Sequence, residues 1–319
     1  MTASVIIPVK NGGPLFREVL ARVMAQRAPW RYECLVIDSG STDGSVEAAR
    51  RQAGVRVHQI APAEFGHGRT RNLGCRLTSG DFIVFLTQDA LPGDERWLDH
   101  LVSAAARWDD AAGAFGRHVA YPDARIVTHR ELEAHFAGFG SEVTRARIDD
   151  AERFRADPGY RQVLHFFSNN NACIRRDVWQ RLPFPEIDFA EDQAWALKAV
   201  EAGYSKVYAP HAWVYHSHDF GLLETSRRAF DEARALRRLF GYDLVPTWRH
   251  LLRDWRLGSR RDLAWVRAAP APWTRRVAQG LYAPWLVLAK LLGRYLGTHH
   301  GRFGAWTRRL SRDEALRRR

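Results

Sequence analysis

Two acidic residues follow apolar runs that have the composition of buried β-strands. Asp38 ends the run Glu33–Asp38, and Asp89 follows the run Phe82–Leu86 closely. Five consecutive apolar residues rich in β-branched and aromatic types are typical of a strand inside a parallel sheet. In open α/β sheets, ligands bind at the carboxyl ends of the strands. We therefore expect Asp89 to be a metal or substrate ligand, with Asp38 on the same edge of the sheet.

The second half of the chain offers two further groups that could do chemistry. Glu191 and Asp192 are adjacent at the start of a predicted helix, residues 193 to about 201. They could supply a general base, or they could simply complement the helix dipole. His216 and His218 alternate in an extended segment, which places both imidazoles on one face. Imidazole is a suitable ligand for Mn²⁺, although either histidine could instead be structural.

The order of the predicted elements places these groups. Apolar runs predict strands over residues 3–9, 33–38, 55–60 and 82–86, and helical spacing predicts helices over about 14–26, 45–52 and 69–77. This alternation is typical of a parallel, doubly wound α/β sheet. The turn after the first strand lacks G-x-G-x-x-G spacing, so we do not expect a dinucleotide-binding domain. Residues 121–160 are polar without a clear period, and we expect a variable insertion there.

The composition is that of a globular protein, with 46% hydrophobic and 26% charged residues in a chain of 319. This length fits one large α/β domain with an appendage. The three cysteines are scattered without metal-ligand spacing, so we expect buried free thiols in a reducing compartment. A strand begins almost at the N-terminus, and no uncharged apolar run reaches about 18 residues. We therefore expect neither a signal peptide nor a membrane-spanning helix.

The net charge of +12 is concentrated in the C-terminal part of the chain. Residues 221–319 hold 22 Lys and Arg against 8 Asp and Glu, a net charge of +14, whereas residues 1–220 hold 26 against 28, a net charge of −2. A near-neutral domain thus precedes a strongly basic tail. Such a tail is expected to bind a polyanion, either membrane phospholipid or nucleic acid.

The basic tail is predicted to be helical. Residues 225–240 carry apolar side chains on one face, and residues 284–296 start with a proline and stop before Gly297, as helices often do. In the second helix, Trp285, Leu288, Leu292 and Leu296 align, with Lys290 and Arg294 opposite. A helix of this kind could lie in a membrane interface or pack on the catalytic domain. We expect an anionic membrane contact.

Several motifs occur in an order that points to one enzyme family. They are Ser4–Asn11, Val36–Ser45 (VIDSGSTDGS), Gly68–Gly74 (GRTRNLG), Phe85–Pro92 (FLTQDALP), Phe167–Arg176 (FSNNNACIRR), Phe184–Gln193 (FPEIDFAEDQ) and Tyr204–His218. Over about 220 residues the chain resembles the family 2 inverting nucleotide-sugar glycosyltransferases, which have the GT-A fold. The TQDA form, the HG-x-T-R-N loop and the H-S-H triplet most resemble the rhamnosyltransferase branch of that family.

The resemblance implies a nucleotide-sugar site at the carboxyl edge of the sheet. Pro8, Val9 and Asn11 would line the base or ribose. Asp38 would accept a hydrogen bond from the imide N–H of uracil or thymine, because a carboxylate only accepts. It could instead cap the turn that follows it. Asp43 precedes a glycine and is expected to be structural.

The same resemblance places further residues around the diphosphate. Arg71 would contact the diphosphate or a base edge through its planar guanidinium. His67, between two glycines, could approach the donor or lie in solvent, and we assign Gln88 to the same site. Asp89 would bind a divalent cation, Mn²⁺ or Mg²⁺, although Thr87 replaces the first of the two acids that are usual in the family.

The resemblance also assigns the base and the acceptor contacts. Asp192 would take the proton from the acceptor hydroxyl, and Glu191 would support it or bind the acceptor. Asn169, Asn170 and Asn171 precede the base, and their amides could hydrogen-bond sugar hydroxyls or satisfy a tight turn. His216 is expected to be the second protein ligand of the cation or a phosphate contact, with His218 or a structural role as the alternatives.

We therefore expect a catalytic domain over residues 1–220, with a nucleotide-binding half (1–116) and an acceptor and base half (117–220). A helical basic extension would follow over residues 221–319. The predicted function is inverting, metal-dependent transfer from a dTDP- or UDP-sugar, first of all dTDP-rhamnose, to a polysaccharide or lipid-linked saccharide. The protein would be cytoplasmic and peripheral at the inner face of the membrane. A two-carboxylate glycoside hydrolase and a nucleic-acid-binding protein are the alternatives. Neither explains the acidic edge, so no nucleic-acid partner is expected.

Overall fold

The computed structural model of the protein describes residues 1–187, 189–303 and 310–311, and the chain divides into two compact units. Unit 1 comprises residues 1–119 and 135–216. Unit 2 comprises residues 120–134 and 217–319. The second unit is therefore assembled from two separate stretches of the chain.

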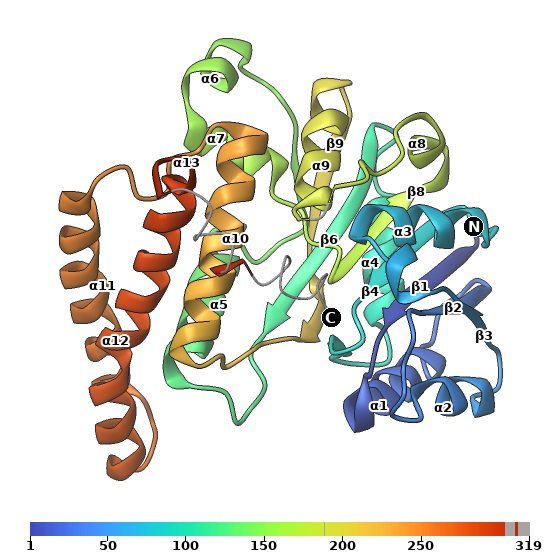
Figure 1. The fold of residues 1–319 in the computed structure, drawn as a ribbon. Helices are drawn as coiled ribbons and strands as arrows, with labels where there is room; N and C mark the ends of the chain where they lie inside the picture. The colour runs from blue at the N-terminus through green and yellow to red at the C-terminus, as the bar shows by residue number, and fades with distance from the viewer. Residues whose placement is uncertain (188, 304–309, 312–319) are drawn as a thin grey trace. The chain divides into compact units, whose positions relative to one another are not determined.

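Unit 1 is built on a mixed, nine-stranded sheet (Figure 1). The strands are β1 (Ala3–Val9), β2 (Tyr32–Asp38), β3 (Val55–Gln59), β4 (Phe82–Leu86), β5 (Leu91–Pro92), β6 (Ala111–Val119), β7 (Thr144–Ala146), β8 (Asn171–Arg175) and β9 (Ser205–Tyr215). Their order is β3-β2-β1-β4-β8-β6-β9-β5, and β7 pairs with β9. Strands β3, β2, β1, β4, β6 and β9 share one direction, while β8, β5 and β7 run the other way. The predicted, mostly parallel α/β sheet is confirmed.

The helices of unit 1 follow the predicted alternation with two corrected starts. They are α1 (Gly13–Met24), α2 (Ser45–Arg51), the 3₁₀ turn η1 (Pro62–Glu64), α3 (His67–Arg76), α4 (Trp97–Ala105), α6 (Ala151–Ala156), α7 (Pro158–His165), α8 (Arg176–Arg181) and α9 (Glu191–Glu201). Helix α3 starts at His67 rather than Arg69, and α9 starts at Glu191 rather than Gln193. The segment without a clear period contains regular elements: α5 (Ile126–Ala137), β7, α6 and part of α7.

The central strands are buried on both faces, as the continuous apolar runs predict. In β1 every residue except Pro8 is buried, and in β4 burial extends from Ile83 to Leu86. Helix α3 packs very closely on the sheet, since a Cβ at Gly74 would lie 2.7 Å from Ile6 Cγ2. Because α3 connects the parallel strands β3 and β4, it begins at the carboxyl edge of the sheet.

Unit 2 contains the first part of α5 and a set of C-terminal helices: α10 (Leu222–Phe240), α11 (Trp248–Ala268), α12 (Trp273–Thr298) and α13 (His300–Phe303). Helices α10 and α12 meet at two glycines. A Cβ at Gly293 would lie 2.1 Å from the Ser226 carbonyl oxygen, and one at Gly297 would lie 2.3 Å from that of Phe230. Small residues at one-turn spacing therefore let the two backbones approach.

Helices α11 and α12 lie side by side in unit 2 (Figure 1). Leu251 of α11 and Leu291 of α12 share one buried cluster, with Val287 packed against it. The sequence predicts that Pro284 begins a helix, but in the structure Pro284 lies inside α12. Its carbonyl oxygen accepts a hydrogen bond from Trp255 Nε1 at 3.0 Å.

The structure also corrects the cationic face that was predicted for this helix. Lys290 Nζ lies 3.2 Å from the Glu131 carboxylate, and Arg294 Nη2 lies 3.0 Å from that of Glu232. Both basic side chains thus form ion pairs inside unit 2, because α5 and α10 supply carboxylates that the local pattern of α12 does not show. None of the helices in the described ranges is long and apolar enough to span a membrane.

Candidate active site

The loops that follow β1 and β2 are joined by a network of polar contacts. Asn11 Oδ1 accepts a hydrogen bond from the Thr42 amide at 2.8 Å, and the Asn11 amide donates to Ser41 Oγ at 2.8 Å. The Asp43 carboxylate accepts from the Gly13 amide at 2.7 Å, which gives it the structural role expected for it. Asn11 itself has a positive φ of 52°, in the left-handed region that asparagine tolerates. These contacts fix the shape of the predicted nucleotide edge.

Asp38 lies inside this network and is fully buried. Its carboxylate accepts hydrogen bonds from the Gly40 amide at 3.0 Å and the Ser41 amide at 3.2 Å. The alternative role of Asp38, capping the turn that follows, is therefore present in the structure. Its contact with a base stays a prediction.

Gln88 connects the loop after β4 to the loop after β1. Its Oε1 accepts from the Lys10 amide at 2.8 Å, and its Nε2 donates to the Lys10 carbonyl at 3.3 Å. Pro8 and Val9 precede Lys10 at the end of β1, with Val9 buried and Pro8 half-buried. Gln88 thus aligns the backbone beside the two residues predicted to line the nucleotide.

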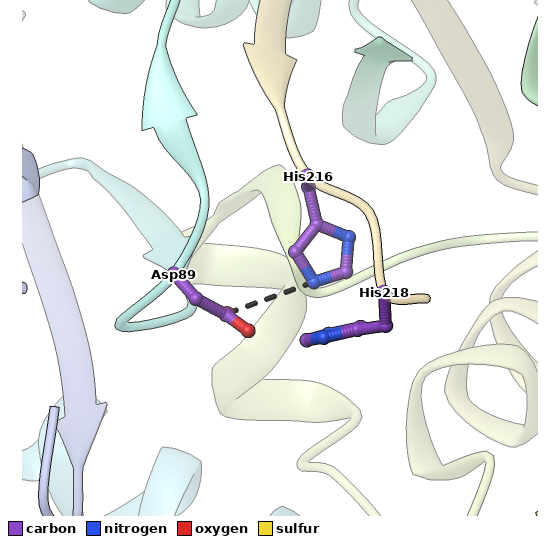
Figure 2. A group of neighbouring side chains, drawn as sticks. All are labelled: Asp89, His216 and His218. Atoms are coloured by element: carbon purple, nitrogen blue, oxygen red, sulfur yellow. Dashed lines mark ion pairs between the residues drawn. The ribbon is translucent and has the colours of Figure 1, made fainter. Parts of the chain in front are cut away.

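Asp89, His216 and His218 form a cluster of possible metal ligands (Figure 2). One ligand atom from each lies within 4.8 Å of the other two, and His216 Nε2 lies 3.6 Å from Asp89 Oδ1. Asp89 follows β4 and His216 follows β9, so the sheet brings together two residues that are far apart in the sequence. Behind His216, the ring of buried His118 lies 5.2 Å away. Burial is the main cause that holds the pKa of His118 well below its usual value, and the charge of a protonated His216 is the next. The imidazole of His118 is therefore neutral.

The first turns of α3 hold the segment that leads to α9. A Cβ at Gly68 would lie 2.1 Å from the Pro185 carbonyl oxygen, so only glycine fits there. Asn72 Nδ2 donates to the Phe184 carbonyl at 2.9 Å, and Asn72 Oδ1 accepts from the Phe184 amide at 3.1 Å. The HG-x-T-R-N motif is therefore a clamp on the residues that precede Glu191 and Asp192.

Arg71 belongs to the same clamp. Its Nη1 lies 2.6 Å from Glu191 Oε1 in a buried ion pair, and both side chains are only about 5% exposed. Burial alone would raise the pKa of Glu191, but Arg71 and then His67 overcome that effect and lower the pKa. The structure thus gives Arg71 a carboxylate partner, while its predicted contact with the donor diphosphate stays a prediction. His67 is exposed at the start of α3.

Asp192 is half-buried in the first turn of α9. Its Oδ2 accepts from the Asn169 amide at 3.0 Å, and its Oδ1 accepts from the Gln193 amide at 2.8 Å. Burial, followed by the neighbouring negative charge of Glu191, raises the pKa of Asp192 to about 7. Ala190, the residue before the pair, has a positive φ of 57°, which is strained for a residue with a side chain. A carboxylate poised near neutrality suits proton transfer.

The segment Asn169–Asn171 joins the metal-ligand loop to this carboxylate. Leu86 pairs with Asn171 across β4 and β8, and the Thr87 amide donates to the Asn170 carbonyl at 3.4 Å. Since the Asn169 amide donates to Asp192, one short segment contacts both the 87–89 loop and the base candidate. The two ends of the predicted site therefore share one edge of the sheet.

Asn170 and Asn171 lie differently from one another. Asn170 is half-buried at this edge. Asn171 is fully buried; its Oδ1 accepts from Trp97 Nε1 at 2.9 Å, and its Nδ2 donates to the Ala212 carbonyl at 2.8 Å. In this state Asn171 stabilises the sheet, and its contact with an acceptor stays a prediction.

Comparison with known proteins identifies the family of this chain. Residues 4–182 match the domain described as glycosyl transferase family 2. The chain is 33% identical over 236 residues to the O-antigen chain rhamnosyltransferase RfbN of Salmonella typhimurium, which covers 72% of this chain and 71% of that protein. The chain belongs to glycosyl transferase family 2.

Other relatives agree with this assignment. The O-antigen chain rhamnosyltransferase WbaN of Salmonella anatum is 30% identical over 231 residues, covering 72% of this chain and 70% of that protein. Among solved structures, the mannosyltransferase PcManGT from Pyrobaculum calidifontis, in complex with GDP-Man and Mn²⁺, superposes with a TM-score of 0.59 at 20% identity. That match covers 95% of this chain and 87% of that one, and it supports the fold. The protein is thus a family 2 glycosyltransferase of the rhamnosyltransferase type.

A divalent cation fits the Asp89 cluster of this family 2 transferase. One carboxylate and two imidazoles are donors that Mn²⁺ accepts. The Thr87 hydroxyl, at the position where the family usually has an acid, is buried and makes no hydrogen bond within the described residues. A polar atom in that position suits a ligand-binding edge better than a closed core.

Sequence reasoning missed the role of Asn72, and for Asn169 and His218 it named the residue without the contacts that the structure shows. Asn72 and Asn169 have polar contacts that bridge distant segments, and His218 joins the ligand cluster rather than standing only as an alternative to His216. Asn72 and Asn169 lie within recognised motifs, but motif membership does not show which partner a side chain will contact.

Proposed function

We propose that this family 2 transferase moves rhamnose from dTDP-rhamnose to a hydroxyl of a polysaccharide or lipid-linked saccharide, with inversion at the anomeric carbon. The rhamnosyltransferase relatives support the choice of sugar. A UDP-sugar is the alternative donor. The single observation that carries the proposal is that the segment Asn169–Asn171 contacts both the Asp89 loop and Asp192, and this supports the proposed diphosphate and base roles of the two residues at one edge.

The nucleotide would bind along the edge formed by the loops after β1 and β2. Pro8, Val9 and Asn11 would contact the base and ribose, and Asp38 would accept from the imide N–H of thymine. For that contact the bonds from Gly40 and Ser41 to Asp38 would have to share the carboxylate or open. His67, Arg71 and Gln88 would complete the donor site from the α3 and β4 sides.

Asp89 and His216 would hold a divalent cation, with His218 as a further ligand. When bound, the cation would offset negative charge on the departing nucleoside diphosphate. The protein's own contribution here is to fix three donor atoms within 4.8 Å, from segments that follow two different strands.

Asp192 would act as the general base. As the acceptor oxygen attacks the anomeric carbon, its proton would pass to an Asp192 carboxylate oxygen, while the bond from carbon to the diphosphate oxygen breaks. No covalent intermediate is needed for one displacement, so the configuration inverts. Glu191, Asn170 and Asn171 are the proposed acceptor contacts, with Glu191 also supporting the base. The predicted contact of residues 221–319 with an anionic membrane at the inner face also belongs to this proposal.

Replacing Asp192 with Asn tests the base directly. A positioned base contributes roughly 10²–10⁴-fold to the rate. We expect transfer to fall by at least about a hundredfold, while calorimetry still detects donor binding. Asp177→Asn, a half-buried position in α8 outside the proposed site, is the matched control and should leave transfer unchanged. Near-normal turnover of the Asp192→Asn variant would remove Asp192 from this role.

Donor identity is tested by thermal shift with Mn²⁺ present. We expect dTDP-rhamnose to raise the melting temperature more than a panel of UDP-sugars or GDP-mannose does. The glycoside hydrolase alternative predicts donor cleavage at full rate without acceptor, whereas a transferase should release nucleoside diphosphate mainly when a saccharide acceptor is present.

A further inference from the structure

A row of large apolar side chains runs along the first half of α12. Trp273, Val277, Leu281 and Trp285 recur every four residues, so they share one face of the helix. Their exposed fractions are 69%, 52%, 73% and 59%, in that order. Leu292 extends the same face and is also exposed. Scattered exposed apolar residues need no explanation, but a continuous row of them marks an interaction surface.

This row is not needed for the packing of unit 2. The buried side of α12 is formed by other residues: Ala283 and Leu291 belong to buried clusters, and Gly293 and Gly297 contact α10. We call the row Trp273, Val277, Leu281, Trp285 and Leu292 the α12 stripe. Helix α12 therefore has one side packed inside its unit and another side that presents tryptophan and aliphatic groups to solvent.

The neighbouring helix α11 supplies positive charge. Arg249, Arg253, Arg256, Arg260 and Arg267 are all exposed, and their spacing places them on one face. Arg253 lies 2.8 Å from Asp254, whereas Arg256 and Arg260 have no carboxylate partner among the described residues. The two helices are joined by residues 269–272 and pack together as a helical hairpin (Figure 1).

We propose that this α11–α12 hairpin docks on an anionic phospholipid bilayer, with the α12 stripe inserted at the boundary between the headgroups and the acyl chains. The inference rests on the proposed membrane contact of the tail and names the surface that makes it. It replaces the face predicted from sequence, whose Lys290 and Arg294 are engaged with Glu131 and Glu232.

Three observations favour lipid over a second copy of the chain. Tryptophan suits the boundary between water and hydrocarbon. The part of the α12 stripe with four-residue spacing begins at Trp273 and ends at Trp285. The arginine row would repel the same row on a second copy, whereas anionic headgroups neutralise it. The surrounding region carries a net charge of +14 over residues 221–319.

Vesicle flotation of the full-length chain tests the proposal. We expect binding to vesicles that contain phosphatidylglycerol and little binding to phosphatidylcholine alone. The double variant Leu281→Gln/Trp285→Gln should lose roughly tenfold or more of its partition into vesicles, because two apolar side chains no longer leave water. Val163→Gln, which changes an exposed apolar residue of unit 1, should float like the parent.

A charge-matched pair tests the arginine row. Arg256→Glu/Arg260→Glu should weaken binding to acidic vesicles roughly tenfold or more, since each basic residue near an anionic surface contributes appreciably. Arg17→Glu/Arg51→Glu makes the same change in net charge on exposed helices of unit 1 and should have a much smaller effect. Equal binding with and without acidic lipid, or equal loss in both pairs, would overturn the proposal. The proposal would also be overturned if light scattering without lipid showed that the parent chain is a dimer and the Leu281→Gln/Trp285→Gln variant a monomer.

The same preparations separate this proposal from the proposed function. All these variants should transfer sugar to a short, water-soluble acceptor at the parental rate, because none lies in the catalytic site. Flotation without any transfer would contradict the proposed sugar transfer alone, and transfer without flotation would contradict the docking surface and the membrane contact of the tail but not the sugar transfer.

Discussion

The ion pair between Arg71 and Glu191 leads to a prediction about the pH dependence of transfer. Glu191→Gln removes a negative charge beside Asp192 and leaves the positive charge of Arg71 without its partner. The loss of that negative charge favours ionisation of Asp192, whose pKa of about 7 is raised by burial first and by Glu191 second. The pKa of Asp192 should therefore fall in this variant, but burial should keep it above that of an ordinary aspartate.

The size of the shift follows from the charges involved. Two unit charges about 6 Å apart, in an effective dielectric of about 20, interact by about 3 kcal/mol. One pKa unit corresponds to 1.36 kcal/mol, so the pKa of Asp192 should fall by about 2 units. A base must be deprotonated to act, so activity rises with pH through its pKa. We expect the rising limb of kcat/KM to move from near pH 7 to near pH 5.

The assay is the initial rate of transfer from about pH 4 to about pH 9, with kcat/KM fitted at each pH. Glu186→Gln, an exposed glutamate in the segment before α9, is the control and should keep the parental limb. Glu191→Gln should also lose about 3–5 kcal/mol of stability, because it strands a buried guanidinium. The double variant Arg71→Gln/Glu191→Gln should regain part of that loss and show a smaller acid shift.

The outcome that refutes this reasoning is clear. If Glu191→Gln and the double variant remain folded and active while their rising limbs stay near pH 7, the titrating base is not Asp192. A limb that moves to higher pH would contradict the expected sign of the interaction between Glu191 and Asp192.

Three further predictions concern the metal cluster and the α3 clamp. Asp89→Ala should weaken Mn²⁺-dependent donor binding by at least about tenfold in calorimetry, and leave the weak metal-free binding unchanged. Gly68→Ala should destabilise the fold by about 1–3 kcal/mol in urea unfolding and lower kcat, because its methyl group must displace the Pro185 carbonyl. Asn72→Ala should cost about 2–3 kcal/mol in the same assay, since it leaves the buried amide and carbonyl of Phe184 without partners; a loss below about 0.5 kcal/mol would contradict the clamp.

The sheet could be predicted because its signals are local. Runs such as Phe82–Leu86 carry the composition of buried strands within five residues, and the alternation with helices fixes their direction. The helices of residues 126–165 lack that signal: α5 has a weakly amphipathic sequence, and α6 is short. Pro284 gave the wrong start for α12 because a proline inside a long helix looks locally like a first-turn proline.

The site was harder to predict, because its contacts span long sequence distances. Arg71 and Glu191 are separated by 120 residues, and nothing near Arg71 shows that a carboxylate will meet its guanidinium. The burial of Asp38 and Asn171 likewise depends on how neighbouring strands pack, so a motif could name these residues without showing what they contact. Asp89 and His216 each follow a strand, but the sequence linked these two residues through the family resemblance and not through their spacing.

Strand β8 has a consequence for engineering this kind of enzyme. It is antiparallel to its neighbours β4 and β6, so the residues that precede β8 lie at the same edge of the sheet as the residues that follow β4. The proposed donor-side and acceptor-side segments thereby lie next to each other, although they are far apart in the sequence and are synthesised at different times. A new acceptor half grafted onto this scaffold should therefore keep β8 and the asparagines at its start together with residues 191–192, because an exchange that cuts the chain between them would separate Asp192 from the Asp89 loop.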